Sequence, residues 1–162
     1  MAIDGSMNIV QVQHQWYTTV YYNAGASSMT NITNFAKDIQ MKFTGGKVLV
    51  HIQFTGLLNC DGSLTFKRDG TVQENNFLGT ERQHANSSSN SSNHHDSATY
   101  SGFFLDNPNS SSGTWHTYQV CARATGCGND VYINRSPGNS SQNGAQELEI
   151  MGNSSRSDIK KP

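Results

Sequence analysis

The last third of the chain contains four short segments in which apolar and polar residues alternate, separated by turn-forming residues. They lie at Phe103–Pro108, Trp115–Ala124, Val131–Ser136 and Leu148–Met151. Alternation with a period of two residues is typical of β-strands, and nothing between these segments predicts a helix. The chain is therefore expected to form antiparallel β-structure.

The same pattern continues towards the N-terminus. It is strongest where Val48, Val50, Ile52 and Phe54 alternate with polar or smaller residues, which predicts a central core strand. Asp69-Gly70 predicts a tight hairpin turn, because Gly accepts a positive φ without steric cost. Further strands are expected at Asn8–His14, Trp16–Tyr22, Ile39–Phe43, Leu64–Phe66, Thr71–Phe77 and Ala98–Leu105.

A short helical turn is considered only at Thr30–Lys37. About eight to ten short strands joined by polar loops predict an all-β fold, an antiparallel β-sandwich or jelly roll. The length of 162 residues fits one domain. We expect residues 1–7 to be cloning-derived or linker residues, residues 8–152 to form the domain, and residues 153–162 to form a flexible tail.

Composition agrees with this interpretation and excludes some partners. Charged residues make up 14 % of the chain, against about 25 % in an average soluble protein. The net charge is −1 and the Lys and Arg residues are scattered, so no basic face for nucleic acid is expected. No apolar run is long enough to span a membrane, and the N-terminus carries no visible signal peptide.

The three cysteines are too few and too irregularly spaced for a disulfide framework or a zinc site. Cys121 and Cys127 flank one predicted hairpin turn, so a bridge between them is geometrically feasible. Free thiols, Cys60 included, are the favoured interpretation.

Several segments in order resemble a known group of domains. These are Ile9–Val12, Lys47–Ile52, Lys67–Gly70, Phe104–Asn109, Thr117–Ala124, Val131–Ser136 and Glu147–Met151. Together they are similar to the C1q/TNF-like jelly-roll domains that end viral and phage tail fibres and some bacterial trimeric fibres. The resemblance covers Asn8–Gly152. It implies a homotrimer around a three-fold axis, located on a virion or an extracellular fibre, whose distal loops touch the host.

An aromatic group is large for so polar a chain, and the implied trimer gives it a role. Its members are Trp16, Tyr17, Tyr21, Tyr22, Phe103, Phe104 and Trp115. We expect Trp16, Tyr17, Tyr22 and Trp115 to lie in the trimer interface. The alternative is that the whole group belongs to the core of one chain.

Ligand binding is expected in the Ser/Asn-rich segment 86–96, which departs from the family pattern as an insertion. Amide side chains match sugar hydroxyls and aromatic rings stack on sugar C–H faces, so the expected ligand is a host cell-surface glycan, with a cell-surface protein as the alternative. The candidate residues are Asn86, Asn90, Asn93, His94 and His95. His94, His95 and Asp96 offer metal-ligand types, but neighbouring histidines need a rigid frame, so we expect no metal.

No motif for a nucleophile, a phosphate loop or a metalloprotease is present, and no Ser/His/Asp arrangement can be singled out from the sequence. Asp69 and Asp106 are interpreted as turn formers. We therefore expect no catalytic residues, no enzymatic activity and no cofactor. The expected function is a trimeric fibre-tip adhesion domain. The alternatives are a structural trimerisation knob without a receptor and a polysaccharide-degrading enzyme.

Overall fold

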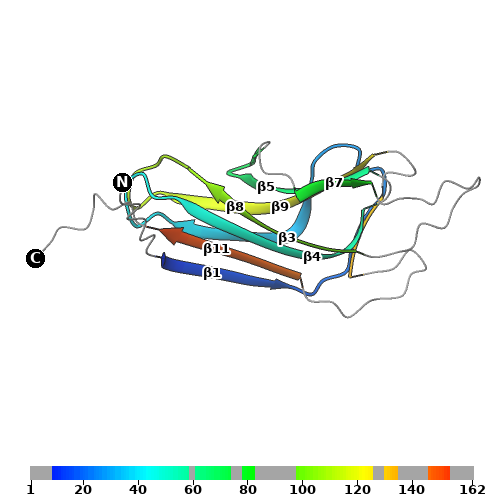
Figure 1. Cartoon of the computed structure of the whole chain (residues 1–162), viewed down its shortest axis with the longest axis horizontal. Coiled ribbons are helices and arrows are strands. Elements are labelled where there is room, and N and C mark those ends of the chain that lie inside the picture. Colours follow the sequence, from blue (N-terminus) through cyan, green and yellow to red (C-terminus); the bar gives the residue numbers. More distant parts are fainter. Residues whose placement is uncertain are drawn as a thin grey trace, which may run out of the picture.

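The computed structural model describes residues 9–58, 61–73, 78–82, 98–125, 130–134 and 146–153. These residues form an all-β, antiparallel two-sheet sandwich (Figure 1). The strands are β1 (Ile9–Tyr17), β2 (Tyr21–Asn23), β3 (Thr30–Gln40), β4 (Val48–Leu58), β5 (Asp61–Arg68), β6 (Thr71–Val72), β7 (Leu78–Arg82), β8 (Ala98–Asp106), β9 (Trp115–Thr125), β10 (Val131–Ile133) and β11 (Gln146–Asn153). Among the described residues, no helix is long and apolar enough to cross a membrane.

The two sheets draw their strands from both halves of the chain. Sheet A has the order β1-β11-β4-β10-β2, and β8 pairs with the other edge of β4. Sheet B has the order β3-β9-β5-β6, and β7 also pairs with β5. With the short strands β2, β6 and β10 set aside, the pairs are nested: β1 with β11, β3 with β9, β4 with β8, and β5 with β7. The second half of the chain therefore folds back along the first.

The core lies between the sheets and confirms the prediction for β4. Val48, Val50 and Ile52 are fully buried, and β4 has hydrogen-bonded neighbours on both edges. From sheet B, Phe66 packs against them, with its ring centroid 5.6 Å from that of Phe104 and 5.5 Å from that of Tyr118. The inward positions predicted on the last three strands are buried as well: Tyr118, Val120, Ala122, Val131, Ile133, Leu148 and Ile150.

The helical turn considered at Thr30–Lys37 is wrong, because this segment belongs to strand β3. Its buried residues Ile32, Phe35 and Ile39 are spaced by three and four positions, as on a helix face. The spacing arises instead from a register irregularity between Asn31 and Ala36, within which Asn34 has φ 62°. A bulge inserts residues into one strand and so shifts the alternation.

Several strand boundaries also differ from the predictions, and β3 ends at Gln40, so the strand predicted at Ile39–Phe43 is wrong. β1 continues through Trp16 to Tyr17, and the chain leaves the sheet before β2 begins at Tyr21.

The predicted Asp69-Gly70 hairpin is confirmed: Arg68 pairs with Thr71, and the two turn residues have φ 51° and 82°. Two consecutive positive φ angles are the geometry of a type I′ turn.

The sandwich has two distinct ends. At the proximal end, β1 begins beside the end of β11, with Ile9 paired to Asn153 (Figure 1). At the distal end, β8 begins at Ala98, paired with Gly56, while the other end of β8 pairs with Val48. β11 begins at the distal end as well, since Gln146 pairs with Tyr17. The described strand ends on either side of residues 83–97 and 135–145 therefore lie at the distal end.

Candidate functional site

The outer face of sheet A carries a continuous apolar row across its four long strands. Strand register places Val12 opposite Met151, Met151 opposite Leu49, and Leu49 opposite Leu105. Val12 is 48 % exposed and Leu105 is 46 % exposed, while Leu49 and Met151 are half-buried. A row of large apolar side chains facing solvent is typical of a protein contact surface.

The apolar character of this face continues with aromatic and histidine side chains. The ring of His51 stacks on Phe103, with centroids 4.2 Å apart, and His51 Nε2 lies 3.2 Å from Ser101 Oγ. Phe103 is nevertheless 63 % exposed. On β1, Trp16 is 58 % exposed and contacts the ring of His14 edge-on.

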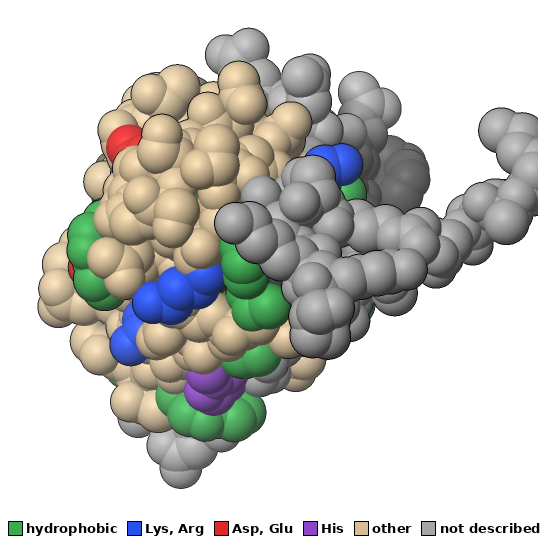
Figure 2. All heavy atoms as spheres, turned by 90° about the vertical axis from the view of Figure 1, so that its left-hand side faces the viewer, with side chains coloured by type: hydrophobic (Ala, Val, Ile, Leu, Met, Phe, Trp, Pro, Cys, Tyr) green, Lys and Arg blue, Asp and Glu red, His purple; other side chains and the backbone are tan. Residues whose placement is uncertain are grey.

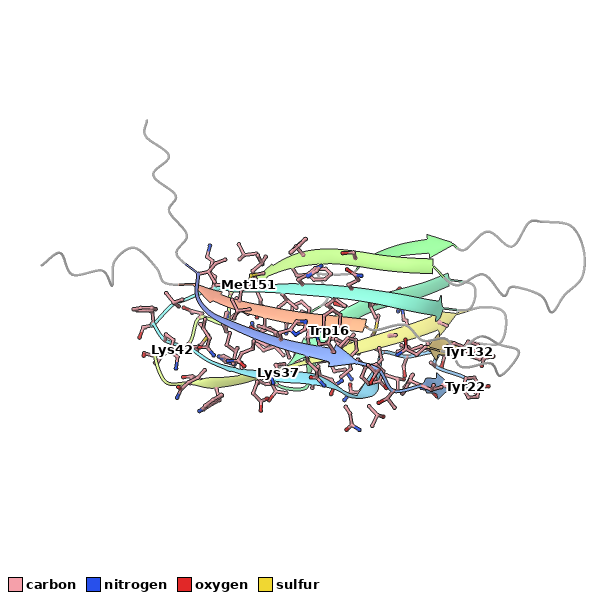
Figure 3. The ribbon with its side chains drawn as sticks, turned by 90° about the horizontal axis from the view of Figure 1, so that it is seen from below. Trp16, Tyr22, Lys37, Lys42, Tyr132 and Met151 are labelled. Atoms are coloured by element: carbon pink, nitrogen blue, oxygen red, sulfur yellow. The ribbon has the colours of Figure 1, made fainter. Side chains whose placement is uncertain are left out.

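At the distal end of the same sheet, Tyr22 of β2 stacks on Tyr132 of β10 with centroids 4.9 Å apart. Figure 3 shows these two rings together at one end of the molecule and Lys42 at the other. We call the exposed and half-buried members of this set the sheet A surface; it comprises Val12, Trp16, Tyr22, Leu49, His51, Phe103, Leu105 and Met151, whereas Tyr132 is only 9 % exposed.

The residues expected in a trimer interface fall into three environments. Trp16 and Tyr22 lie on the sheet A surface. Trp115 is 62 % exposed but pairs with Gln40 on the outer face of sheet B. Tyr17 is only 3 % exposed and stacks on Phe35 inside the core, so it offers a neighbouring chain little surface. The alternative that the whole aromatic group is internal is wrong, since Phe103 and three of these four residues are exposed.

Among the described residues, basic side chains do not form a broad face at the proximal end. Figure 2 views the molecule from this end, and the Lys and Arg side chains drawn there make a narrow stripe and a separate small patch at the upper right. Hydrophobic and histidine side chains adjoin one another below that stripe.

The predicted ligand residues Asn86, Asn90, Asn93, His94 and His95 lie outside the described residues, as does Asp96. Within the part of the chain that the structure describes, no three His, Cys, Asp or Glu side chains form a group that could hold a metal ion.

A polar network closes the proximal end of the sandwich. Arg68 Nη1 donates to both carboxylate oxygens of Asp106 at 2.7 Å, and the Tyr118 hydroxyl donates to Asp106 Oδ2 at 2.7 Å. Asp106 is 5 % exposed, so its carboxylate is an internal anchor and not the turn former that the sequence indicated. Burial raises the pKa of Tyr118, and its hydrogen bond to Asp106 raises it further.

A second part of this network joins Ser110 and His116, six positions apart, to Asp69, which lies 47 positions before His116. His116 Nδ1 lies 2.6 Å from Asp69 Oδ2, and His116 Nε2 lies 2.8 Å from Ser110 Oγ. Burial by itself would raise the pKa of Asp69, but hydrogen bonds from His116 and the Thr117 N–H, together with the charge of Arg68, hold it below its ordinary value. No sequence pattern predicts this set, because its members come from a turn, a loop and a strand.

Cys121 is a free thiol that is fully buried on β9, which agrees with the favoured interpretation of this cysteine. Burial raises its pKa to about 12, against a smaller opposite effect of Lys67. Because the thiolate is the nucleophilic form, the native thiol should be unreactive at pH 8.

We therefore expect iodoacetamide at pH 8 to modify Cys121 at least about 100-fold more slowly in the folded protein than in guanidinium chloride. Peptide mass spectrometry measures this cysteine separately from Cys60 and Cys127. Equal rates with and without denaturant would contradict the buried position.

The chain matches no known protein-family model, and no curated protein is significantly similar to it in sequence.

Proposed function

We propose that this sandwich is a jelly roll of the C1q/TNF type that forms the homotrimeric tip of a virion or extracellular fibre and binds a cell-surface receptor, a glycan by preference. The observation that carries the proposal is the sheet A surface, which leaves several large apolar side chains in contact with solvent when the chain is alone.

The strand order supports the jelly-roll assignment. Jelly rolls are double-sheet folds of eight strands built from two Greek keys. The nested pairing of β1 with β11, β3 with β9, β4 with β8 and β5 with β7 is what results when one long hairpin of four strand pairs is rolled into two sheets.

The composition of the sheet A surface supports association of like chains. Monomeric proteins seldom expose a contiguous apolar patch of more than a few hundred Å². The row from Val12 to Leu105 crosses the whole width of the sheet, and Phe103 and Trp16 extend it. A fibre contains identical chains about one axis, so its terminal domain has to close under the same symmetry.

The arrangement of the ends supports receptor binding by the Ser/Asn-rich segments. The strands on either side of residues 83–97 and 135–145 end and begin at the distal end, opposite Ile9 and Asn153. If the chain is attached to a fibre shaft through its N-terminal side, these strand ends lie on the side away from the shaft. Loops carried on a rigid sandwich are suited to recognition.

Deleting residues 86–96 and joining the ends with a short Gly-Ser linker is expected to abolish binding to glycans while the oligomeric state stays that of the wild type. A glycan array probed with both proteins measures binding, and light scattering measures mass. As a matched control, Ser112 on the opposite end is replaced by Gly.

Three outcomes separate the alternatives. Binding that survives the deletion would contradict the position of the receptor site. A trimer that binds neither glycans nor host cells would favour the structural knob. Release of reducing ends from host polysaccharide would favour a polysaccharide-degrading enzyme and overturn the adhesion proposal.

A further inference from the structure

Ser110, His116 and Asp69 have the hydrogen-bond connectivity of a hydrolytic triad. The carboxylate of Asp69 accepts at one ring nitrogen of His116, and the serine hydroxyl lies at the other, with distances of 2.6 Å and 2.8 Å. Nucleophile, base and orienting carboxylate in this order define a triad by geometry and not by sequence position.

The carboxylate of Asp69 determines which ring nitrogen of His116 carries the proton. A carboxylate only accepts hydrogen bonds, so Nδ1 of His116 has to carry the proton that Asp69 Oδ2 accepts. In the neutral ring Nε2 is then an acceptor, and the Ser110 hydroxyl donates to it. This tautomer is the one in which His116 can take the serine proton.

Asp69 is held in place although its side chain is 47 % exposed. Its Oδ1 accepts from the Thr117 N–H at 2.9 Å, and its own N–H donates to Thr117 O at 3.0 Å. His116 is 8 % exposed, so its ring is fixed between the two partners and screened from water. A base that is pre-oriented in this way needs little reorganisation during proton transfer.

The loop that carries Ser110 is tied to the β3–β4 connection on its other side. Gly45 N–H donates to Ser110 O at 2.9 Å, and Gly113 N–H donates to Met41 O at 2.7 Å. The Ser112 hydroxyl donates to Lys42 O at 2.9 Å, and the Ser112 N–H donates to Thr44 Oγ1 at 3.2 Å. Among the described residues, none of these bonds uses the N–H of Ser111, the residue after the serine.

We propose that Ser110, His116 and Asp69 form a second, hydrolytic site at the proximal end that cleaves short-chain acyl esters. Ser110 and His116 are the catalytic residues, and Asp69 is a positioning residue. This departs from the expectation of a protein without enzymatic activity, and it does not depend on the adhesion proposal.

The reaction that this geometry supports is acyl transfer to water. Ser110 Oγ attacks the ester carbonyl carbon while His116 Nε2 takes the hydroxyl proton; the ester C–O bond then breaks and the same proton passes to the leaving alcohol. Water attacks the acyl-serine, His116 takes one of its protons, and the carboxylic acid leaves as the serine hydroxyl is restored. The Ser111 N–H is the donor that we assign to the developing oxyanion.

The surroundings of Ser110 argue for a small acyl group. Its exposed neighbours Asn109, Ser111 and Ser112 are all polar, and they supply no apolar wall for a long acyl chain. An acetyl group needs no such wall, whereas an octanoyl chain would stay in water.

A fluorophosphonate probe tests the nucleophile directly, because it bonds covalently only to an activated serine. We expect mass spectrometry to find one adduct, on the peptide that contains Ser110. Ser110→Ala should abolish it, and Ser27→Ala, which changes an exposed serine outside the proposed site, should keep it. No adduct on the wild type, or an adduct that persists in Ser110→Ala, would overturn the proposal.

Hydrolysis of p-nitrophenyl acetate tests the roles of the other two residues. Asp69→Asn keeps the size of the side chain but disfavours the required tautomer, so kcat should fall by about 100-fold or more with little change in KM. p-Nitrophenyl octanoate should be cleaved far more slowly than the acetate. Thermal melts establish that each variant is folded; if Asp69→Asn is folded and keeps the wild-type kcat, the triad is only a structural contact and the proposal fails.

Discussion

Replacing Leu105 by Lys should convert the proposed trimer to a monomer. Leu105 is 46 % exposed in the single chain and ends the apolar row on the edge strand β8. In a trimer with three-fold symmetry, the interface would bury one lysine from each chain. Burying an unpaired charge lowers the stability of the interface by several kcal/mol. Light scattering after size exclusion should give three times the mass of 17.7 kDa for the wild type and the single-chain mass for Leu105→Lys.

The control places the same charge on the other sheet. Thr33 is exposed on β3 of sheet B, so Thr33→Lys should remain trimeric. Both variants should keep the β-sheet circular dichroism spectrum of the wild type. A wild type that is monomeric at every accessible concentration would overturn the trimer, and a trimeric Leu105→Lys would move the interface away from the sheet A surface.

Replacing Asp106 by Ala should lower the free energy of unfolding by about 3 kcal/mol, which corresponds to a fall in Tm of roughly 6–12 °C. The carboxylate accepts two hydrogen bonds from Arg68 and one from the buried hydroxyl of Tyr118. Its removal leaves a guanidinium that is 23 % exposed and a phenol that is fully buried without their acceptor. The measurement is best made in the Leu105→Lys background, because association would otherwise contribute to stability.

Two further variants calibrate this effect. Tyr118→Phe removes one hydrogen bond and no charge, so it should cost about 1 kcal/mol. Asp38→Ala removes an exposed carboxylate that accepts only from Thr117 Oγ1 in the described residues, and it should cost less than about 1 kcal/mol. If Asp106→Ala is no more destabilising than Asp38→Ala, the network does not hold the proximal end together.

Some errors of the sequence-based predictions have a definite physical origin. β3 resembles a helix in sequence because its bulge moves Phe35 out of the two-residue alternation that Ile32 begins. Asp106 resembles a turn former because it precedes Asn107-Pro108, yet its side chain turns inwards to Arg68, which lies 38 positions away. Side-chain partners at such separations leave no local pattern in a sequence.

The positions of some candidate surface residues could be predicted from the sequence, and those of others could not. His51 alternates with the buried residues Val50 and Ile52 in the sequence, and it lies on the outer face of β4 against Phe103. The exposure of Trp16 and the burial of Tyr17 could not be separated by residue type, since both are large aromatic side chains in one segment. They differ because Tyr17 lies on the face of β1 that meets Phe35, while Trp16 lies on the opposite face.

The sequence by itself determined the fold class, the central strand β4, the Asp69-Gly70 turn and the inward positions of the last three strands. These features depend on residues close to one another, whose alternation and turn preferences are local properties. Only the tertiary structure decided the nested strand order, the continuity of the apolar row from Val12 to Leu105, and the meeting of Ser110, His116 and Asp69. These arise when strands distant in the sequence are brought into register, and a one-residue change of register would turn each outward side chain inwards.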